Sequence, residues 1–162
     1  MFFCKKDEKN QEKQAMQAKL TRLRLLYVAV SKNEKAWKEM KTLLSEPSDL
    51  YSPVFAAYEA AFCMISALYT NSPLQKYTAF QKGKKMLERI LTEHPESMEI
   101  RYLRLTIQQN LPAILGYNHT FLDKQFIEKH FSDYQDQELK QKMADFWESG
   151  GWGDLWEIEK RE

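Results

Sequence analysis

Apolar residues recur at helical spacing along most of the chain, and polar residues fill the positions between them. This pattern predicts helices over about residues 15–30, 32–44, 54–70, 73–93, 98–111, 120–131 and 135–148. No segment alternates apolar and polar residues with the period of two that a half-buried strand needs. We therefore predict an all-α fold without a sheet.

The helix around residues 98–111 has two apolar faces instead of one. One face carries Ile100, Leu103, Ile107 and Leu111, and the other carries Met98, Tyr102 and Leu105. Two narrow polar stripes run between them, Arg101/Arg104/Gln108 and Glu99/Thr106/Asn110. A helix with apolar residues nearly all round is typically buried. We expect this helix to lie between neighbouring helices, with its charges along the seams.

Several helix starts and one close helix contact can also be predicted. Ser31-Lys-Asn-Glu34 and Thr120-Phe-Leu-Asp123 have the form of capping boxes, and Ser52-Pro53 and Ser72-Pro73 each place Pro at the first helical position. Gly83 lies in the middle of a predicted helix, where Gly costs about 1 kcal/mol relative to Ala. We expect another backbone to approach the helix at Gly83.

Short connections make successive helices antiparallel neighbours. We predict a short, right-handed array of about six or seven helices in helical hairpins, similar to tetratricopeptide repeats, and a plain helical bundle is the alternative. The array is expected to cover residues 15–148, between a polar N-terminal tail, 1–14, and a Gly/Trp-rich C-terminal tail, 149–162.

Part of the sequence resembles a known family. The similar residues are Tyr77…Phe80-Gln-Lys-Gly-Lys, Glu99-Ile-Arg-Tyr-Leu-Arg, Ile107-Gln-x-Asn-x-Pro-x-x-Leu-Gly-Tyr117 and Asp123-Lys124. Over roughly Arg24 to Phe131 the chain resembles an uncharacterised family of small all-helical bacterial proteins that look like tetratricopeptide proteins. The resemblance implies a helical-repeat fold and no particular activity. Many members begin with an export signal, which this sequence lacks.

Composition excludes several classes of partner. The 24 basic and 23 acidic residues leave a formal net charge of +1, so nucleic acid is not the expected partner. The longest apolar run, residues 53–69, contains Glu59 and is too short to span a membrane, so no transmembrane segment is expected. As written the sequence predicts a cytoplasmic protein. An upstream start with an export signal would instead make it exported or periplasmic.

Glu59 is the first candidate for a functional residue. A single carboxylate in an otherwise apolar helix is costly to bury unless it is paired. We therefore expect Glu59 to pair with Arg101 or Arg104. The pair has two interpretations: a structural ion pair, or the floor of a groove in which Arg101, Arg104 and Gln108 bind an anionic ligand. In the second case Tyr102 or Tyr117 would stand at the rim.

No motif predicts catalysis, a metal or a cofactor. His119 and Asp123 are four residues apart and His130 follows, but a metal site needs three or four converging ligands. The chain has neither a recognisable nucleophile motif nor a Gly-rich phosphate loop. We expect a protein that is not an enzyme and that uses no cofactor.

Aromatic residues cluster near the C-terminus. Trp147, Trp152 and Trp156 lie around three glycines. They either cover the open end of the array, as terminal repeats do, or dock on a partner or on a second copy of the chain. The sequence thus favours a non-enzymatic module that binds a protein or a peptide. A binder of a small anionic molecule, or an enzyme, in the Glu59/Arg101/Arg104 groove is the alternative.

Overall fold

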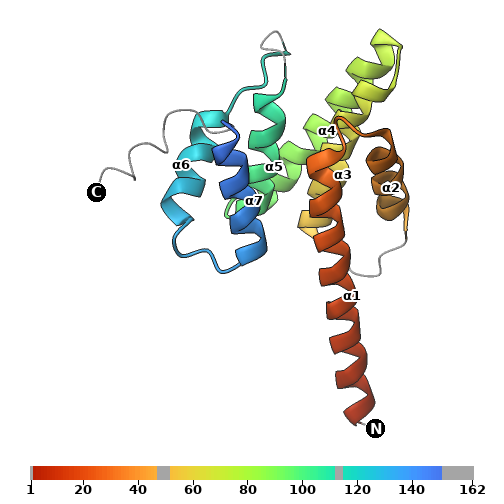
Figure 1. Ribbon diagram of the computed structural model, residues 1–162, viewed down its shortest axis with the longest axis vertical. Coiled ribbons are helices and arrows are strands. Elements are labelled where there is room, and N and C mark those ends of the chain that lie inside the picture. The colour runs from red at the N-terminus through yellow and green to blue at the C-terminus, as the bar shows by residue number, and fades with distance from the viewer. Residues whose placement is uncertain (1, 47–51, 112–114, 151–162) are drawn as a thin grey trace. The chain divides into compact units, whose positions relative to one another are not determined.

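The computed structural model describes residues 2–46, 52–111 and 115–150, with side chains from Lys9 onward (Figure 1). These residues form seven α-helices and one 3-10 helix, and they contain no strand. The elements are α1 (Phe2–Ala29), α2 (Glu34–Ser45), α3 (Pro53–Ile65), η1 (Ser66–Tyr69), α4 (Pro73–Glu93), α5 (Met98–Gln109), α6 (Thr120–His130) and α7 (Gln137–Glu148). The prediction of an all-α fold is confirmed.

Two helices differ most from their predicted bounds. Helix α1 begins at Phe2, so residues 2–14, which were expected to be a polar tail, are helical. Lys, Glu and Gln are good helix formers, so this polar segment can extend the helix without contributing to a core. Helix α3 is shorter than predicted. It ends at Ile65 and continues as the 3-10 helix η1, where the Ser66 hydroxyl donates to the Phe62 carbonyl.

Local hydrogen bonds correct two of the predicted helix starts. The cap of α2 is Asn33 and not Ser31, because Asn33 Oδ1 accepts from the backbone N–H groups of Lys35 and Ala36. Helix α6 has His119 at its N-cap position, without a capping side chain. The predicted capping box there is wrong because Asp123 points into a buried ion cluster, described below.

The chain divides into two compact units, residues 1–88 and 89–162. In the first unit, α1, α2 and α3 pack against one another. Helix α4 approaches α3 at Gly83, where an added Cβ would lie 2.5 Å from the Ala60 carbonyl oxygen and 2.5 Å from Met64 Cγ. The expected close backbone contact at Gly83 is therefore confirmed.

In the second unit α5 is the central helix. Every residue from Met98 to Gln108 is buried except Arg101, which is partly exposed. Even the polar residues of the two seams, Glu99, Arg104, Thr106 and Gln108, are buried. The prediction of a helix buried on all sides is confirmed, and the burial extends to its polar stripes.

The second unit has a core built from three helices. Its buried members are Met98, Tyr102, Leu105, Ile127, Leu139, Met143 and Trp147. Aromatic rings meet edge to face in this core, with Tyr102 against Phe146 at 5.7 Å and Phe131 against Trp147 at 5.1 Å between ring centroids. Edge-to-face pairs of this kind add to the stabilisation from burial alone.

Among the described residues, no helix combines the length and the apolar character needed to cross a lipid bilayer. The longest helix, α1, is largely polar over its first half. For the described residues, this agrees with the prediction of no transmembrane segment, drawn from the short apolar run at residues 53–69.

Candidate functional site

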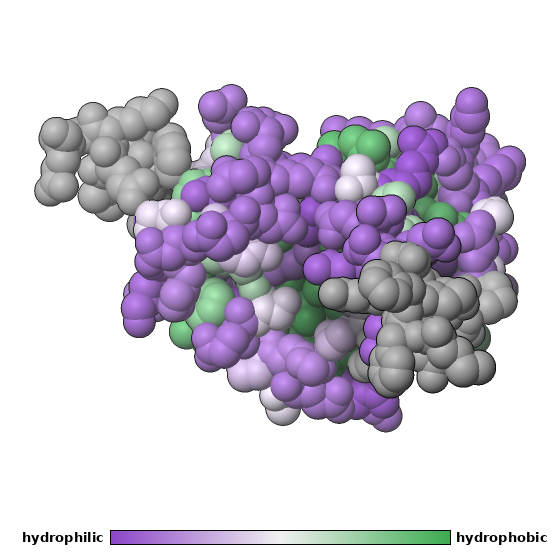
Figure 2. Space-filling view, turned by 90° about the horizontal axis from the view of Figure 1, so that it is seen from below, coloured by the Kyte–Doolittle hydropathy of each residue, from purple (hydrophilic) through white to green (hydrophobic). Residues whose placement is uncertain are grey.

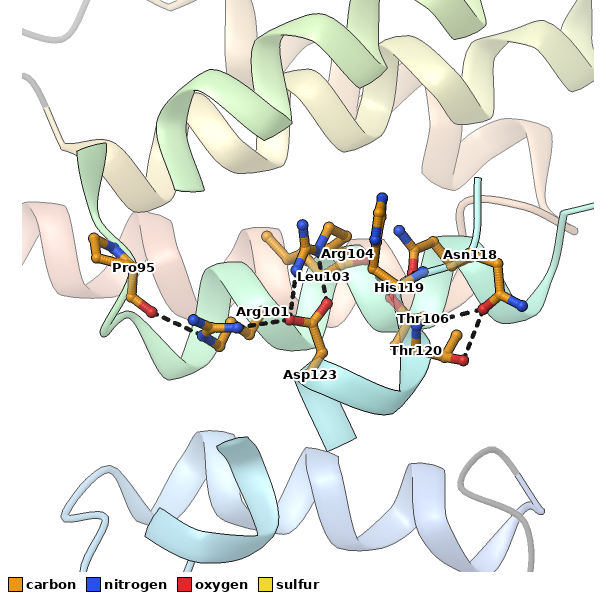
Figure 3. A network of polar contacts seen from close by, with 10 residues as sticks. Pro95, Arg101, Leu103, Arg104, Thr106, Asn118, His119, Thr120 and Asp123 are labelled. Carbon is orange, nitrogen blue, oxygen red and sulfur yellow. Dashed lines mark hydrogen bonds and ion pairs between the residues drawn. The ribbon is translucent and has the colours of Figure 1, made fainter. Parts of the chain in front are cut away.

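A buried charged cluster joins α5 and α6 (Figure 3). Arg101 and Arg104 are three residues apart on α5 and so lie on the same side of the helix. Asp123, in the first turn of α6, lies between them. Because α5 and α6 pack closely, the carboxylate is brought within hydrogen-bonding distance of both guanidinium groups.

Arg104 and Asp123 form a bidentate pair. Arg104 Nε donates to Asp123 Oδ2 at 2.7 Å, and a terminal nitrogen of the same guanidinium donates to Oδ1 at 2.7 Å. The planar guanidinium matches the carboxylate in this geometry, which makes such pairs strong and directional. Asp123 is 0% exposed, so the pair is shielded from solvent.

Arg101 completes the cluster from the other side. A terminal nitrogen of Arg101 donates to Asp123 Oδ1 at 2.9 Å, and its Nε donates to the Pro95 carbonyl at 2.7 Å. The guanidinium also lies over the ring of Phe126, 4.2 Å from the centroid. The Pro95 carbonyl and the face of the Phe126 ring thus also stabilise the positive charge of Arg101.

The prediction that Glu59 pairs with Arg101 or Arg104 is wrong. Glu59 is exposed on α3, so it is not the buried carboxylate that the apolar sequence of this helix suggested. A nearly apolar helix still has one narrow face in solvent, and its single charge occupies that face. Asp123 takes the predicted role instead. Asp123 lies four residues before the buried Ile127, and this spacing indicates that both side chains are on the same buried face of α6. The sequence pattern Thr120-Phe-Leu-Asp123 instead suggested that Asp123 belongs to a capping box.

Gln108 has a structural contact at the end of α5. Its Oε1 accepts from the backbone N–H of His119 at 2.8 Å, which ties α5 to the segment before α6. Among the described residues, its Nε2 is buried without a hydrogen-bond partner. Tyr102 and Tyr117, expected at the rim of a groove, are both buried. Arg101, Arg104 and Gln108 thus make ion-pair and hydrogen-bond contacts within the second unit.

The histidines have local roles. His130 Nδ1 lies 2.7 Å from the Phe126 carbonyl, and its ring stacks on Phe126 with centroids 4.3 Å apart. His119 is exposed, with its ring edge to face against Tyr117. Within residues 2–46, 52–111 and 115–150, no three His, Cys, Asp or Glu side chains converge in a way that could hold a metal ion.

The three candidate docking tryptophans do not share one environment. Trp147 is 7% exposed in the core of the second unit, so for this residue packing within the chain is correct and docking on a partner is wrong. It lies on the buried face of α7 with Leu139 and Met143 and packs in the core. Trp152 and Trp156 lie outside the described residues.

Compared with protein-family models, with curated proteins and with solved structures, the chain matches none. Similarity to known proteins therefore assigns no functional residue. The exposed side chains of the protein are the other place to look for a binding site. Figure 2 shows mostly polar side chains on the face in view, with separate apolar patches between them.

The large exposed apolar side chains form three groups along the chain. They are Leu25 and Val28 on α1, Leu68, Leu74 and Tyr77 around the η1–α4 connection, and Phe121 and Leu122 at the start of α6. The sequence pattern did not single out these groups, because apolar residues at helical spacing can face either a core or solvent. Only packing shows which of them face solvent.

Proposed function

We propose that the protein is a non-enzymatic helical module that binds another protein or a peptide. The observation that carries the proposal is the group Leu68, Leu74 and Tyr77, each more than half exposed within ten residues of chain. Single exposed apolar residues are common on protein surfaces, whereas large ones grouped together are typical of interaction sites. We call this group the tip surface.

The backbone that carries the tip surface is held by local hydrogen bonds. The Thr70 hydroxyl donates to Gln75 Oε1 at 2.5 Å, and the Gln75 backbone N–H lies 3.4 Å from the Ser72 hydroxyl oxygen. Leu74 and Tyr77 are three residues apart on α4 and therefore share one face of the helix. A surface ordered in advance loses less conformational entropy when a partner binds.

The cluster of Arg101, Arg104 and Asp123 supports a binding module over an anion-binding groove. An arginine pair that binds a ligand carboxylate or phosphate needs donors directed at the ligand. In this protein both guanidinium groups are directed at the carboxylate of Asp123. A ligand anion would have to compete with a buried acceptor that is already in place.

The tetratricopeptide-like arrangement and the resemblance to that class of bacterial protein are part of the same proposal. The described helices follow one another through short connections, as helical hairpins do. Proteins built from such hairpins use exposed surfaces to bind other chains.

Site-specific photo-crosslinking tests the proposal directly. A photoreactive phenylalanine derivative, benzoylphenylalanine, is introduced at Tyr77 in the full chain, and in a control chain at Lys35, which is exposed on α2. Irradiation in the native cells should give a discrete covalent adduct from the Tyr77 position. The Lys35 position should give none of that adduct.

Leu74→Glu adds the decisive comparison. Leu74 is exposed, so this substitution should leave the helical content unchanged while it places a charge in the tip surface. Loss of the adduct would support the proposal. Absence of any adduct at Tyr77, or an adduct that persists unchanged with Leu74→Glu, would contradict it.

A further inference from the structure

We propose that the C-terminal segment of this chain, residues 152–158, docks on Phe121 and Leu122 at the start of α6. These two residues are the exposed apolar pair of the second unit, and more than half of each side chain is open to solvent. They stand in the first turn of α6, directly before the buried Asp123. The inference concerns a different surface from the tip surface and does not depend on it.

Topology brings the end of α7 to this surface. Helices α6 and α7 run antiparallel in the second unit, so α7 ends on the side where α6 begins (Figure 1). The Lys140 ammonium of α7 donates to the Ser132 carbonyl, in the connection between the two helices, at 3.1 Å. The chain therefore leaves α7 close to the exposed pair and not at the far end of α6.

The end of α7 is a defined stop. Gly150 has a φ of +84°, in the left-handed region that favours glycine, and its N–H donates to the Trp147 carbonyl at 2.9 Å. Such a residue ends a helix and turns the chain away from the helix axis. Residues 152–158 begin two positions later, and at roughly 3.3 Å per residue they extend up to about 25 Å from Gly150.

The composition of the segment matches an apolar surface. Within seven residues it contains Trp152, Leu155, Trp156 and Ile158. Trp is enriched among the residues that contribute most to binding at interfaces, because it buries a large area with few rotatable bonds. Phe121 and Leu122 offer it two adjacent apolar side chains on a helix that is already ordered.

Charge favours the same pairing. The segment and its next residue carry three carboxylates, Asp154, Glu157 and Glu159. The N-cap of α6, His119, supplies no capping side chain, and the nearby N–H groups donate to Asn118 Oδ1 and to the His119 carbonyl. The N-terminus of a helix carries a partial positive charge that attracts carboxylates. The start of α6 thus combines an apolar contact with an attraction for acidic side chains.

Fluorine NMR of the full chain labelled with 5-fluorotryptophan tests the docking. The four Trp signals are assigned by single Trp→Phe substitutions, one position at a time. We expect the Trp152 and Trp156 signals to lie away from the free-peptide position in the intact chain. They should move to that position in the double variant Phe121→Ser/Leu122→Ser and remain in place in the control Lys129→Ser, an exposed change at the far end of α6.

Each alternative gives a different result. Free-peptide positions in the intact chain would overturn the docking, and signals unmoved by Phe121→Ser/Leu122→Ser would overturn the assigned surface. Signals that depend on protein concentration would show that the segment binds a second copy, which also overturns the proposal. Circular dichroism of the double variant checks that it folds.

A second measurement does not rely on that variant. In Trp152→Ser/Trp156→Ser, whose changes lie outside the described core, the backbone amides in the first turn of α6 should exchange with solvent hydrogen faster than in the intact chain. The amides of α5 should not change. Equal exchange at α6 in both proteins would contradict docking at this helix.

Discussion

Asp123 is a fully buried charged residue in the second unit. Its carboxylate is fully buried and accepts three hydrogen bonds from two arginines. A buried pair of opposite charges can be nearly neutral in its net contribution to stability, because desolvation offsets the attraction. Loss of one partner is different, since it leaves a buried charge without compensation.

We therefore predict that Asp123→Ala lowers the free energy of unfolding by about 3–5 kcal/mol. The triple variant Arg101→Met/Arg104→Met/Asp123→Leu should be much closer to the original protein, because it removes all three charges of the cluster and nearly keeps the volume. Urea unfolding followed by circular dichroism measures both. A loss below about 1 kcal/mol in Asp123→Ala would show that the cluster is not buried as described.

The exposed pair of Lys38 and Glu34 on α2 is a matched control. Their side chains lie 2.7 Å apart, and Lys38 lowers the pKa of Glu34 below its ordinary value through a hydrogen bond and its charge. Both are well exposed, so solvent screens the pair. Lys38→Ala should change stability far less than Asp123→Ala does in the same urea experiment.

Cys63 on α3 gives a prediction about reactivity. Burial raises the pKa of its thiol, the charge of Lys82 lowers it, and the charge of Glu59 raises it further. Glu59→Gln should therefore speed alkylation of Cys63 by iodoacetamide at mildly alkaline pH, and Lys82→Gln should slow it, because only the thiolate reacts. Mass spectrometry of the Cys63 peptide measures the rates. Equal rates in the two variants would contradict the assigned electrostatics.

The same raised pKa has a consequence for stability. Because the folded protein holds the Cys63 proton more tightly than the unfolded chain, the thiol favours folding below the ordinary thiol pKa. This contribution is lost as the pH rises through the folded-state value. Stability is expected to fall on the alkaline side, and Cys63→Ser should reduce that slope.

At the scale of elements, the contact of α3 with α4 has the least tolerance for added atoms. Gly83 allows the two backbones to approach, and a methyl group at this position would meet the Ala60 carbonyl oxygen and the Met64 backbone. Backbone atoms move only if a whole helix moves, unlike the end of a flexible side chain. The packing of these two helices thus depends on the missing side chain of Gly83.

We predict that Gly83→Ala destabilises the protein by about 1–3 kcal/mol, in spite of the better helix propensity of Ala. Thr78→Ala, an exposed change in the same helix, is the control and should have little effect on the unfolding midpoint. Thermal unfolding compares the two variants. A more stable Gly83→Ala protein would mean that propensity outweighs the close contact.

At the scale of the whole molecule, burial is distributed unevenly. In α5 nearly every side chain is buried, whereas in α1 the residues from Lys9 to Ala15 are all exposed. Helices in proteins are held mainly by tertiary packing of a buried face, and exposed turns open more easily. The most exposed of these segments, in α1, belongs to the first unit, and the buried helix α5 belongs to the second.

Hydrogen exchange should reproduce this order. We predict that amides of Tyr102 to Leu105 exchange only through the rarest openings, and that amides of residues 10–15 exchange orders of magnitude faster. Mass spectrometry of peptides from the two helices measures the ratio. Similar protection in both would mean that the first half of α1 is covered by something beyond its described neighbours.

The local features of the fold could be predicted from the sequence. Helical periodicity predicts all seven α-helices, the two apolar faces predict the burial of α5, and Gly83 predicts a close helix contact. These features depend on residues within one or two helical turns of one another, so they can be predicted from the spacing of residues in the sequence. The polar start of α1 was misjudged because helix propensity alone extends a helix beyond its packed part.

The partners of charges could not be predicted in the same way. Arg101 and Arg104 lie 22 and 19 residues from Asp123, and the choice between Asp123 and Glu59 depends on which helices pack together and on which face turns outward. Exposure of Leu74 or burial of Trp147 depends on the same arrangement. By itself, the sequence determined an all-α protein with a central buried helix. Tertiary structure decided which charges are buried as a cluster and which apolar side chains remain available for binding, because both depend on contacts between distant segments.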